Sequence, residues 1–166
     1  ANIPIGRVCR MIDPVGLPDT FVRIVLVGSG NLATQTALAL SEAANPPVQV
    51  WSRNAEHAER LASMLPGATA TDRTEELLCN ADLYLLAVSD HALESVAATL
   101  PPTSGIWTHT AGSMPMDTLR PYHAQIGVFY PLQTFSRERR VDYSSIPIYI
   151  EGNDESVVRL LESVAR

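Results

Sequence analysis

The segment Val22-Arg-Ile-Val-Leu-Val-Gly28-Ser-Gly30-Asn-Leu-Ala33 decides the fold of this chain. Its first half is an almost unbroken apolar run, as expected for a strand that is buried on both faces of a parallel sheet. A Gly-x-Gly-x-x-Ala turn follows, and residues 32–44 then place apolar side chains at helical spacing. Strand, glycine turn and helix in this order indicate a dinucleotide-binding unit.

The same alternation continues along the chain. We expect strands at 22–28, 48–51, 68–71, 83–88, 105–109, 125–130 and 146–151, and helices at 32–44, 55–65, 91–100 and 154–166. This order predicts an α/β fold with a doubly wound, mostly parallel Rossmann sheet, helices on both faces, and a ligand crevice at the carboxyl ends of the strands. Residues 1–21 form an irregular extension in this interpretation, and residues 22–152 form the Rossmann domain. The last helix, within residues 153–166, either packs on the sheet or leads into a further domain.

Composition excludes several classes of function. A formal charge of −6 and a pI near 5.1 argue against a nucleic-acid partner, which would need a basic face. All twelve basic residues are arginines, so there is no lysine for a Schiff base or a Walker motif. Cys9 and Cys79 lie far apart in no metal-binding or disulfide pattern, which favours free thiols in the cytoplasm and no metal. No stretch reads as a signal peptide or membrane span, so we expect a soluble protein.

The glycine turn is the strongest local signal. Gly28 allows the tight turn, Gly30 allows the backbone to approach a pyrophosphate, and the small Ala33 allows helix and strand to pack closely. The alternative is an ordinary tight turn between strand and helix. The predicted contacts with a cofactor in this segment come from Gly28, Ser29, Gly30, Asn31, Leu32 and Ala33.

The end of the second strand, Trp51-Ser52-Arg53-Asn54, points to the kind of dinucleotide. An NAD enzyme usually places an acid here on the ribose hydroxyls, and that acid is missing. Arg53 could stack on adenine and pair with a 2′-phosphate, while Ser52 and Asn54 donate hydrogen bonds. NADP is therefore favoured over NAD, although Arg53 could also be a solvated loop charge.

Two further strand ends carry polar side chains. Val88, Ser89 and Asp90 follow the fourth strand, where we expect them beside the cofactor, and Asp90 is favoured as the cap of helix 91–100 rather than as a catalytic group. The fifth strand ends in His109-Thr110-Ala-Gly-Ser113, so His109 and Thr110 are predicted to contact the cofactor and His109 and Ser113 are candidate catalytic residues. A structural hydrogen-bonding role for His109 is at least as plausible.

Five segments together resemble a known group: Gly28-Ser-Gly-Asn-Leu-Ala, Trp51-Ser-Arg-Asn, Leu85-Leu-Ala-Val-Ser-Asp, His109-Thr-Ala-Gly-Ser and Tyr130-Pro-Leu-Gln-Thr-Phe. The group is that of Rossmann-like NADP-binding oxidoreductases with a helical C-terminal domain of unknown function. It is similar to the pyrroline-5-carboxylate reductases, the deazaflavin-dependent NADP reductases and the 6-phosphogluconate-dehydrogenase-like superfamily. The resemblance implies a missing helical domain that completes the substrate pocket and forms a homodimer. Tyr130 stands where these relatives often have histidine, and residues 131–135 either wall the nicotinamide pocket or form a rigid turn.

Two functional hypotheses follow. The first is an NADP-dependent oxidoreductase that transfers a hydride to or from a small carbonyl or imine substrate. The second is a sensor or interaction module that binds NADP without turnover, because the sequence contains no unambiguous acid, base or nucleophile.

Overall fold

A computed structural model describes residues 22–131 and 147–165 of the chain. The predicted extension 1–21 and residues 132–135 of the Pro-Leu-Gln-Thr-Phe segment lie outside this part. The strands are β1 (Ile24–Val27), β2 (Gln49–Trp51), β3 (Thr69–Thr71), β4 (Leu83–Leu86), β5 (Ile106–His109), β6 (Ile126–Pro131) and β7 (Ile148–Gly152). Each predicted strand is confirmed, with ends shifted by no more than two residues.

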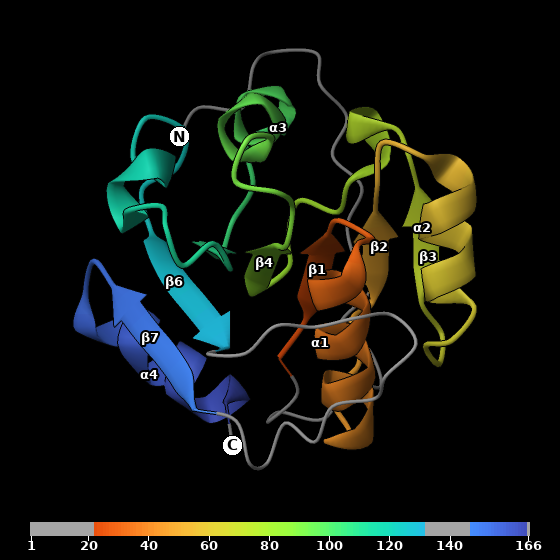
Figure 1. Ribbon diagram of the computed structural model, residues 1–166, viewed down its shortest axis with the longest axis horizontal. Coiled ribbons are helices and arrows are strands. Elements are labelled where there is room, and N and C mark those ends of the chain that lie inside the picture. Colours follow the sequence, from red (N-terminus) through yellow and green to blue (C-terminus); the bar gives the residue numbers. More distant parts are fainter. Residues whose placement is uncertain (1–21, 132–146, 166) are drawn as a thin grey trace.

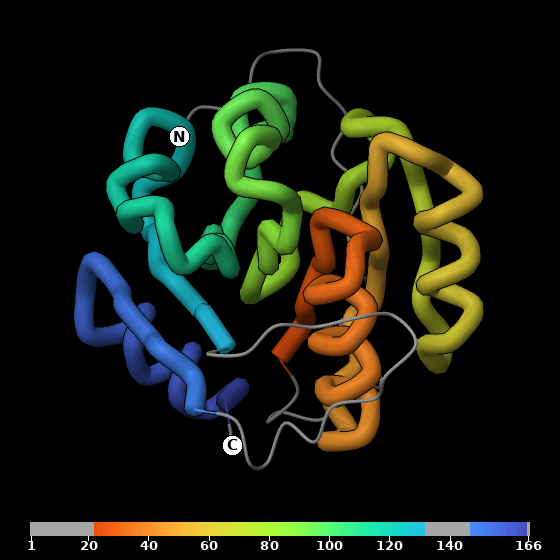
Figure 2. The backbone as a smooth tube through the Cα atoms, in the orientation of Figure 1, coloured from red at the N-terminus to blue at the C-terminus, as the bar shows by residue number. Residues whose placement is uncertain are grey.

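The strands form one sheet in the order β3-β2-β1-β4-β5-β6-β7. All neighbours are parallel except β7, which runs antiparallel to β6. Figures 1 and 2 show the chain winding outward from β1 to β3 and then returning through β4 toward β6 and β7 on the opposite side. The direction of winding reverses between β1 and β4, so the crevice for a ligand lies at the carboxyl ends of these two strands.

Helices cover both faces of the sheet, as the doubly wound interpretation requires. One hydrophobic core joins the sheet to α1 (Asn31–Glu42), α2 (Ala55–Ala62) and α4 (Glu155–Val164). The other joins it to α3 (Leu93–Thr99) and to η2 (Met116–Leu119), and η1 (Thr74–Glu76) lies between β3 and β4 in the chain. The predicted α/β fold is therefore confirmed.

Strand β1 shows why its sequence has no polar alternation. Ile24 and Leu26 enter one core and Val25 and Val27 enter the other, and all four are completely buried. Each such side chain contributes roughly 1.5–3 kcal/mol by leaving water. Burial on both faces fixes β1 at the centre of the sheet, and with it the position of the glycine turn.

The last helix packs on the same sheet. Asp154 caps α4 by accepting a hydrogen bond from the Val157 backbone N–H at 3.0 Å. Val157 and Leu161 are fully buried in the core that also contains Phe129. The sheet therefore covers the apolar stripe of this helix, which is the first of the two interpretations given by the sequence.

Candidate functional site

Gly28 follows β1 and lies between the ends of β2 and β4, the two strands that flank β1 in the sheet. Its backbone N–H donates to the Trp51 carbonyl oxygen at 2.8 Å, and its φ angle is +126°. A Cβ atom at this position would lie 2.3 Å from the Ala87 carbonyl oxygen, which follows β4. Only glycine meets both conditions, so the tight turn predicted at Gly28 has a definite physical cause.

Gly30 is the N-cap of α1 and has open space beside it. Its φ angle is an ordinary −74°, and a Cβ atom here would have no other heavy atom of the described residues within 4 Å. No acidic residue lies in the first turn of α1, so no carboxylate competes for the N–H groups at this helix end. Ala33 is fully buried, which lets the helix approach the sheet. The turn therefore leaves room for an anion at the start of α1.

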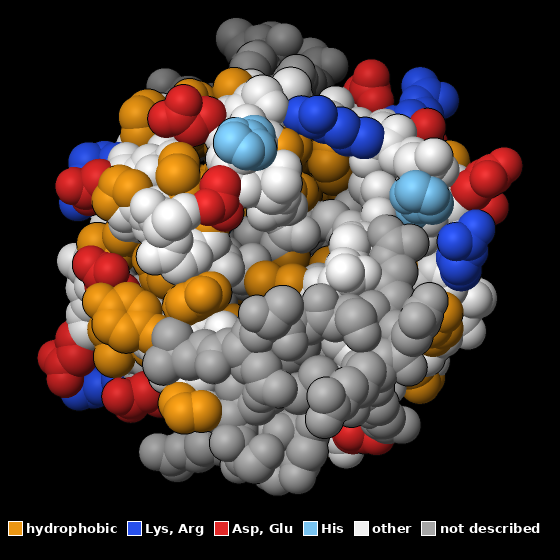
Figure 3. Space-filling view, viewed as in Figure 1, with side chains coloured by type: hydrophobic (Ala, Val, Ile, Leu, Met, Phe, Trp, Pro, Cys, Tyr) orange, Lys and Arg blue, Asp and Glu red, His pale blue; other side chains and the backbone are white. Residues whose placement is uncertain are grey.

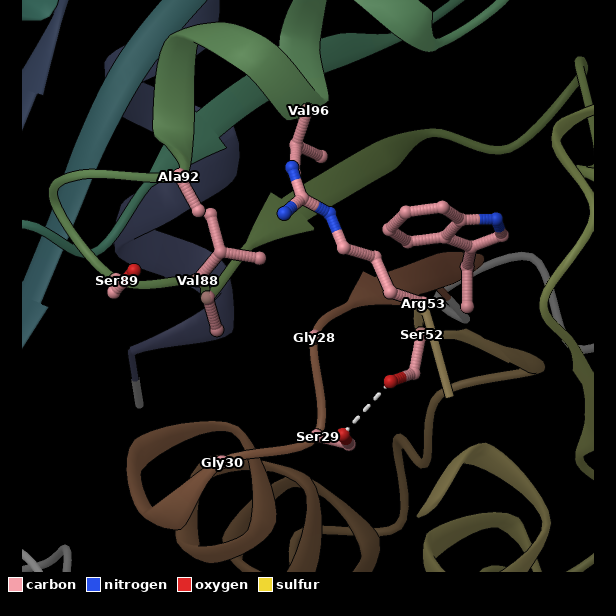
Figure 4. A pocket seen from close by; sticks show the side chains of 11 residues that line it. Gly28, Ser29, Gly30, Ser52, Arg53, Val88, Ser89, Ala92 and Val96 are labelled. Atoms are coloured by element: carbon pink, nitrogen blue, oxygen red, sulfur yellow. Dashed lines mark hydrogen bonds between the residues drawn. The ribbon is translucent and has the colours of Figure 1, made fainter. Parts of the chain in front are cut away.

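A cavity of about 200 Å³ lies directly beside this turn (Figure 4). Three parts of the chain line it: the glycine turn, the end of β2, and the segment that leads from β4 into α3. The lining residues are Gly28, Ser29, Gly30, Trp51, Ser52, Arg53, Ala87, Val88, Ser89, Ala92 and Val96. The structure thus brings together seven of the residues proposed from sequence: Gly28, Ser29, Gly30, Ser52, Arg53, Val88 and Ser89.

The cavity has a polar side and an apolar side. Ser29 Oγ and Ser52 Oγ lie 2.9 Å apart and share a hydrogen bond, drawn as a dashed line in Figure 4. Val88, Ala92 and Val96 line the cavity from the β4–α3 side. Such a cavity can hold a flat aromatic ring against its apolar wall while its hydroxyls meet polar substituents.

Arg53 extends from the end of β2 across the cavity toward α3 (Figure 4). Its guanidinium Nη2 donates to Ser95 Oγ at 2.8 Å. The neighbouring Asn54 caps α2 through its side-chain oxygen, which accepts from the His57 backbone N–H at 3.2 Å. The three residues that follow β2 are Ser52, Arg53 and Asn54, so this strand end carries an arginine and no acid.

The predicted capping role of Asp90 is wrong. Helix α3 begins at Leu93, its N-cap is Ala92, and no side chain caps it. Residues 89–92 instead form a turn that closes with a hydrogen bond from Ala92 N–H to the Ser89 carbonyl oxygen. The Asp90 carboxylate accepts a hydrogen bond from the Ser113 hydroxyl, which links the loops after β4 and β5.

His109 has the geometry of a structural residue. The Ala111 N–H donates to Nδ1 at 3.1 Å, so the proton of the neutral ring lies on Nε2, which donates to the Pro115 carbonyl oxygen at 3.1 Å. The side chain is fully buried, and this burial lowers its pKa below the ordinary value despite the hydrogen bond to Pro115. Both ring nitrogens are therefore hydrogen-bonded within the loop that His109 supports.

Two other residues of this edge are placed by the structure. Thr110 is buried, and its hydroxyl oxygen has no hydrogen-bond partner among residues 22–131 and 147–165. Tyr130 lies across Gly112, where a Cβ atom would approach the Tyr130 ring to 2.4 Å. The loop after β5 and the end of β6 are thus in direct contact.

Comparison with known proteins identifies the group to which this geometry belongs. The model of the family described as NADP oxidoreductase, coenzyme F420-dependent, matches residues 23–107. The chain belongs to this family. The resemblance derived from the sequence motifs is thereby confirmed.

Individual relatives agree with this assignment. The crystal structure of BF3122 from Bacteroides fragilis, described as an NADP oxidoreductase, is 36% identical in sequence to this chain. The match has a TM-score of 0.81 and covers 88% of this chain and 57% of BF3122. Glycerol-3-phosphate dehydrogenase [NAD(P)+] 2 from Sphingopyxis alaskensis is 32% identical over 45% of this chain and 26% of its own length. A reductive aminase from Aspergillus terreus in complex with NADPH shares the fold, with a TM-score of 0.64 and 16% identity over 87% of this chain and 52% of its own. The chain spans about half the length of the two solved structures.

The site fits the dinucleotide that the family name implies. Open space at Gly30 and the first turn of α1 can take a pyrophosphate, and the cavity between Val88 and Arg53 can take an adenosine. The sequence motifs did not indicate the part of the cavity wall formed by Ala92 and Val96. The spacing of Ala92 and Val96 at i and i+4 is a signal that one face of α3 looks toward the crevice.

Within residues 22–131 and 147–165, no three His, Cys, Asp or Glu side chains are grouped closely enough to hold a metal ion. None of the helices in these ranges is long and apolar enough to cross a bilayer.

Proposed function

We propose that this domain binds NADP(H) and positions it for hydride transfer in an oxidoreductase. The observation that carries the proposal is the cavity that joins the Gly28–Gly30 turn to Arg53, at a strand end that lacks the acid of an NAD site. Family membership and the 36% identity to an NADP oxidoreductase support the same conclusion.

Each part of the site has a role in this proposal. The pyrophosphate lies over Gly30 and the N-terminus of α1, within reach of Asn31, Leu32 and Ala33 backbone groups. Adenine lies between Arg53 and the apolar wall, and the 2′-phosphate accepts hydrogen bonds from Arg53, Ser52 and Asn54. The Asn54 side-chain oxygen caps α2, which leaves its NH₂ group as the donor.

The reactive end lies over β4 and β5. Ser89, Asp90 and Thr110 border the position expected for the nicotinamide ribose, because the dinucleotide runs along this edge from β2 past β1. When bound, NADPH supplies the hydride. Ser113 is then the candidate group that contacts the small carbonyl or imine substrate, and its hydroxyl is oriented by Asp90. His109 takes no part in this proposal except to hold its loop.

We also propose that a helical domain beyond this chain completes the substrate pocket and mediates a homodimer, and that the protein works in the cytoplasm. The length of the two solved relatives supports the first point, because the chain covers only 57% and 52% of them. The spacing of Cys9 and Cys79, which fits no disulfide or metal-binding pattern, supports the proposal of a cytoplasmic location.

A second candidate is an NADP-binding sensor without turnover. It is favoured by the hydrogen bonds on both ring nitrogens of His109, since this residue is one of the two candidate catalytic residues proposed from the sequence. Binding of NADP(H) and NAD(H) to this chain, measured by calorimetry, tests the common part of both candidates, and we expect NADP(H) to bind more tightly. NADPH oxidation by a longer form of the protein with a panel of imines and ketoacids separates them. Absence of turnover with every substrate would favour the sensor.

A further inference from the structure

A hydrogen-bonded relay connects the two walls of the cavity. Arg53 Nη2 donates to Ser95 Oγ at 2.8 Å, and Ser95 Oγ donates to the Ala92 carbonyl oxygen at 3.0 Å. Arg53 and Ser95 are 42 positions apart in sequence, in the loop after β2 and on α3 respectively. Ala92 and its helical neighbour Val96 themselves line the cavity. The relay therefore fixes the guanidinium to the same turn that forms the apolar wall.

An arginine held in this way differs from one in solution. Arginine has several rotatable bonds, and ordering its side chain costs conformational entropy. In the present structure part of this ordering precedes any ligand, because one nitrogen of the fork is already bonded to Ser95. Among the described residues the guanidinium has no other hydrogen-bond partner, and Figure 4 shows the side chain reaching from the end of β2 toward Val96.

We propose that Ser95 is a positioning residue that holds Arg53 in place for the adenosine 2′-phosphate end of the cofactor, and so contributes to the choice of NADP over NAD. This inference rests on the proposed function. The sequence gives no hint of it, since Ser95 belongs to no motif and is an exposed residue in the first turn of α3.

The experiment uses small probes that occupy only this end of the site. Adenosine 2′-monophosphate carries the phosphate that Arg53 is expected to meet, and adenosine 5′-monophosphate does not. Affinities of both probes and of NADP are measured by calorimetry for the wild type, Ser95→Ala, Ser95→Thr, Arg53→Ala and the double variant Ser95→Ala/Arg53→Ala. Ser163→Ala is the matched control, because Ser163 Oγ donates to the carbonyl oxygen three residues earlier, as Ser95 does, in a helix far from the cavity.

We expect Ser95→Ala to weaken the binding of adenosine 2′-monophosphate and of NADP by about three- to tenfold, which is the range for one lost hydrogen bond. The affinity for adenosine 5′-monophosphate should change little. Ser95→Thr keeps a hydroxyl and should retain most of the affinity. In the Arg53→Ala background, Ser95→Ala should have no further effect, because its partner is gone. Ser163→Ala should behave as the wild type.

Three results would overturn the inference: unchanged 2′-phosphate affinity in Ser95→Ala, equal weakening of both probes, or full additivity with Arg53→Ala. Any of them would mean that Ser95 acts only on the helix or not at all. If the proposed function itself were wrong, the wild type would bind neither NADP nor adenosine 2′-monophosphate, and this result is distinct from the three above.

Discussion

Replacing Gly28 by alanine should destabilise the fold strongly, whereas a larger replacement at Gly30 should not. The two glycines belong to one motif and are two residues apart, yet their surroundings differ. Gly28 has φ +126° and would place a Cβ atom 2.3 Å from the Ala87 carbonyl oxygen and 2.8 Å from the Ala87 carbonyl carbon. Gly30 has φ −74°, and no heavy atom of the described residues lies within 4 Å of the place where its Cβ atom would be.

The magnitude follows from these contacts. A non-glycine residue at such a positive φ costs about 1–3 kcal/mol, and displacing a backbone segment to relieve the overlap costs about as much again. Neither atom of Ala87 can move alone, because the Ala87 N–H is bonded to the Val27 carbonyl oxygen at 2.8 Å, within the central β1–β4 pair. We expect a loss of about 3 kcal/mol, or a Tm lower by about 6–12 °C. Valine at Gly30 should cost less than about 1 kcal/mol, mainly through its poorer N-cap propensity.

Urea and thermal unfolding of Gly28→Ala and Gly30→Val measure these differences, and calorimetry with NADP provides the second readout. Gly30→Val should stay folded and lose dinucleotide binding, because its branched side chain fills the space proposed for the pyrophosphate. A Gly28→Ala protein as stable as the wild type would refute the argument from close approach. Native affinity in folded Gly30→Val would refute the phosphate assignment.

Three further predictions concern the cofactor, the pH and the extent of the chain. Arg53→Ala should weaken the binding of NADP by about ten- to a hundredfold, because a hydrogen bond to a charged group contributes about 1.5–3 kcal/mol. An unchanged NADP affinity in calorimetry would contradict the proposed role of Arg53. Stability should fall as pH drops below about 6.5, because burial lowers the pKa of His109 and of His123, so the unfolded chain binds protons that the folded chain does not. Urea unfolding between pH 5.5 and 8 tests this, with a slope of up to about 1.4 kcal/mol per pH unit for each histidine; a flat profile would count against it. On the proposal that a further helical domain completes the pocket, this chain should bind NADPH but turn over no substrate, because an open site neither excludes water nor holds reactants near about 3–3.5 Å. Equal NADPH oxidation by this chain and by a longer form would show that Ser113 and its neighbours already make a complete site.

The sequence by itself determined the elements and the kind of site. Apolar runs, helical periodicity and the glycine turn are local patterns, so the strands and helices could be placed within a few residues. The missing acid after β2 could also be read directly, because a strand end and its ligand contacts are fixed by the Rossmann topology. Most of the residues that line the cavity were therefore foreseeable.

Only the tertiary structure decided how the side chains at the strand ends are used. Asp90 accepts from Ser113 instead of capping α3, Arg53 donates to Ser95, and His109 has both nitrogens bonded within its own loop. The first two partners are 23 and 42 positions apart in sequence. Such hydrogen bonds depend on where the parallel register places each loop and on which donors remain unsatisfied there, and neither is contained in a local pattern. For the same reason, the apolar stripe of α4 could be read from the sequence, whereas the surface of β6 and β7 on which it packs was decided by the order of the strands in the sheet.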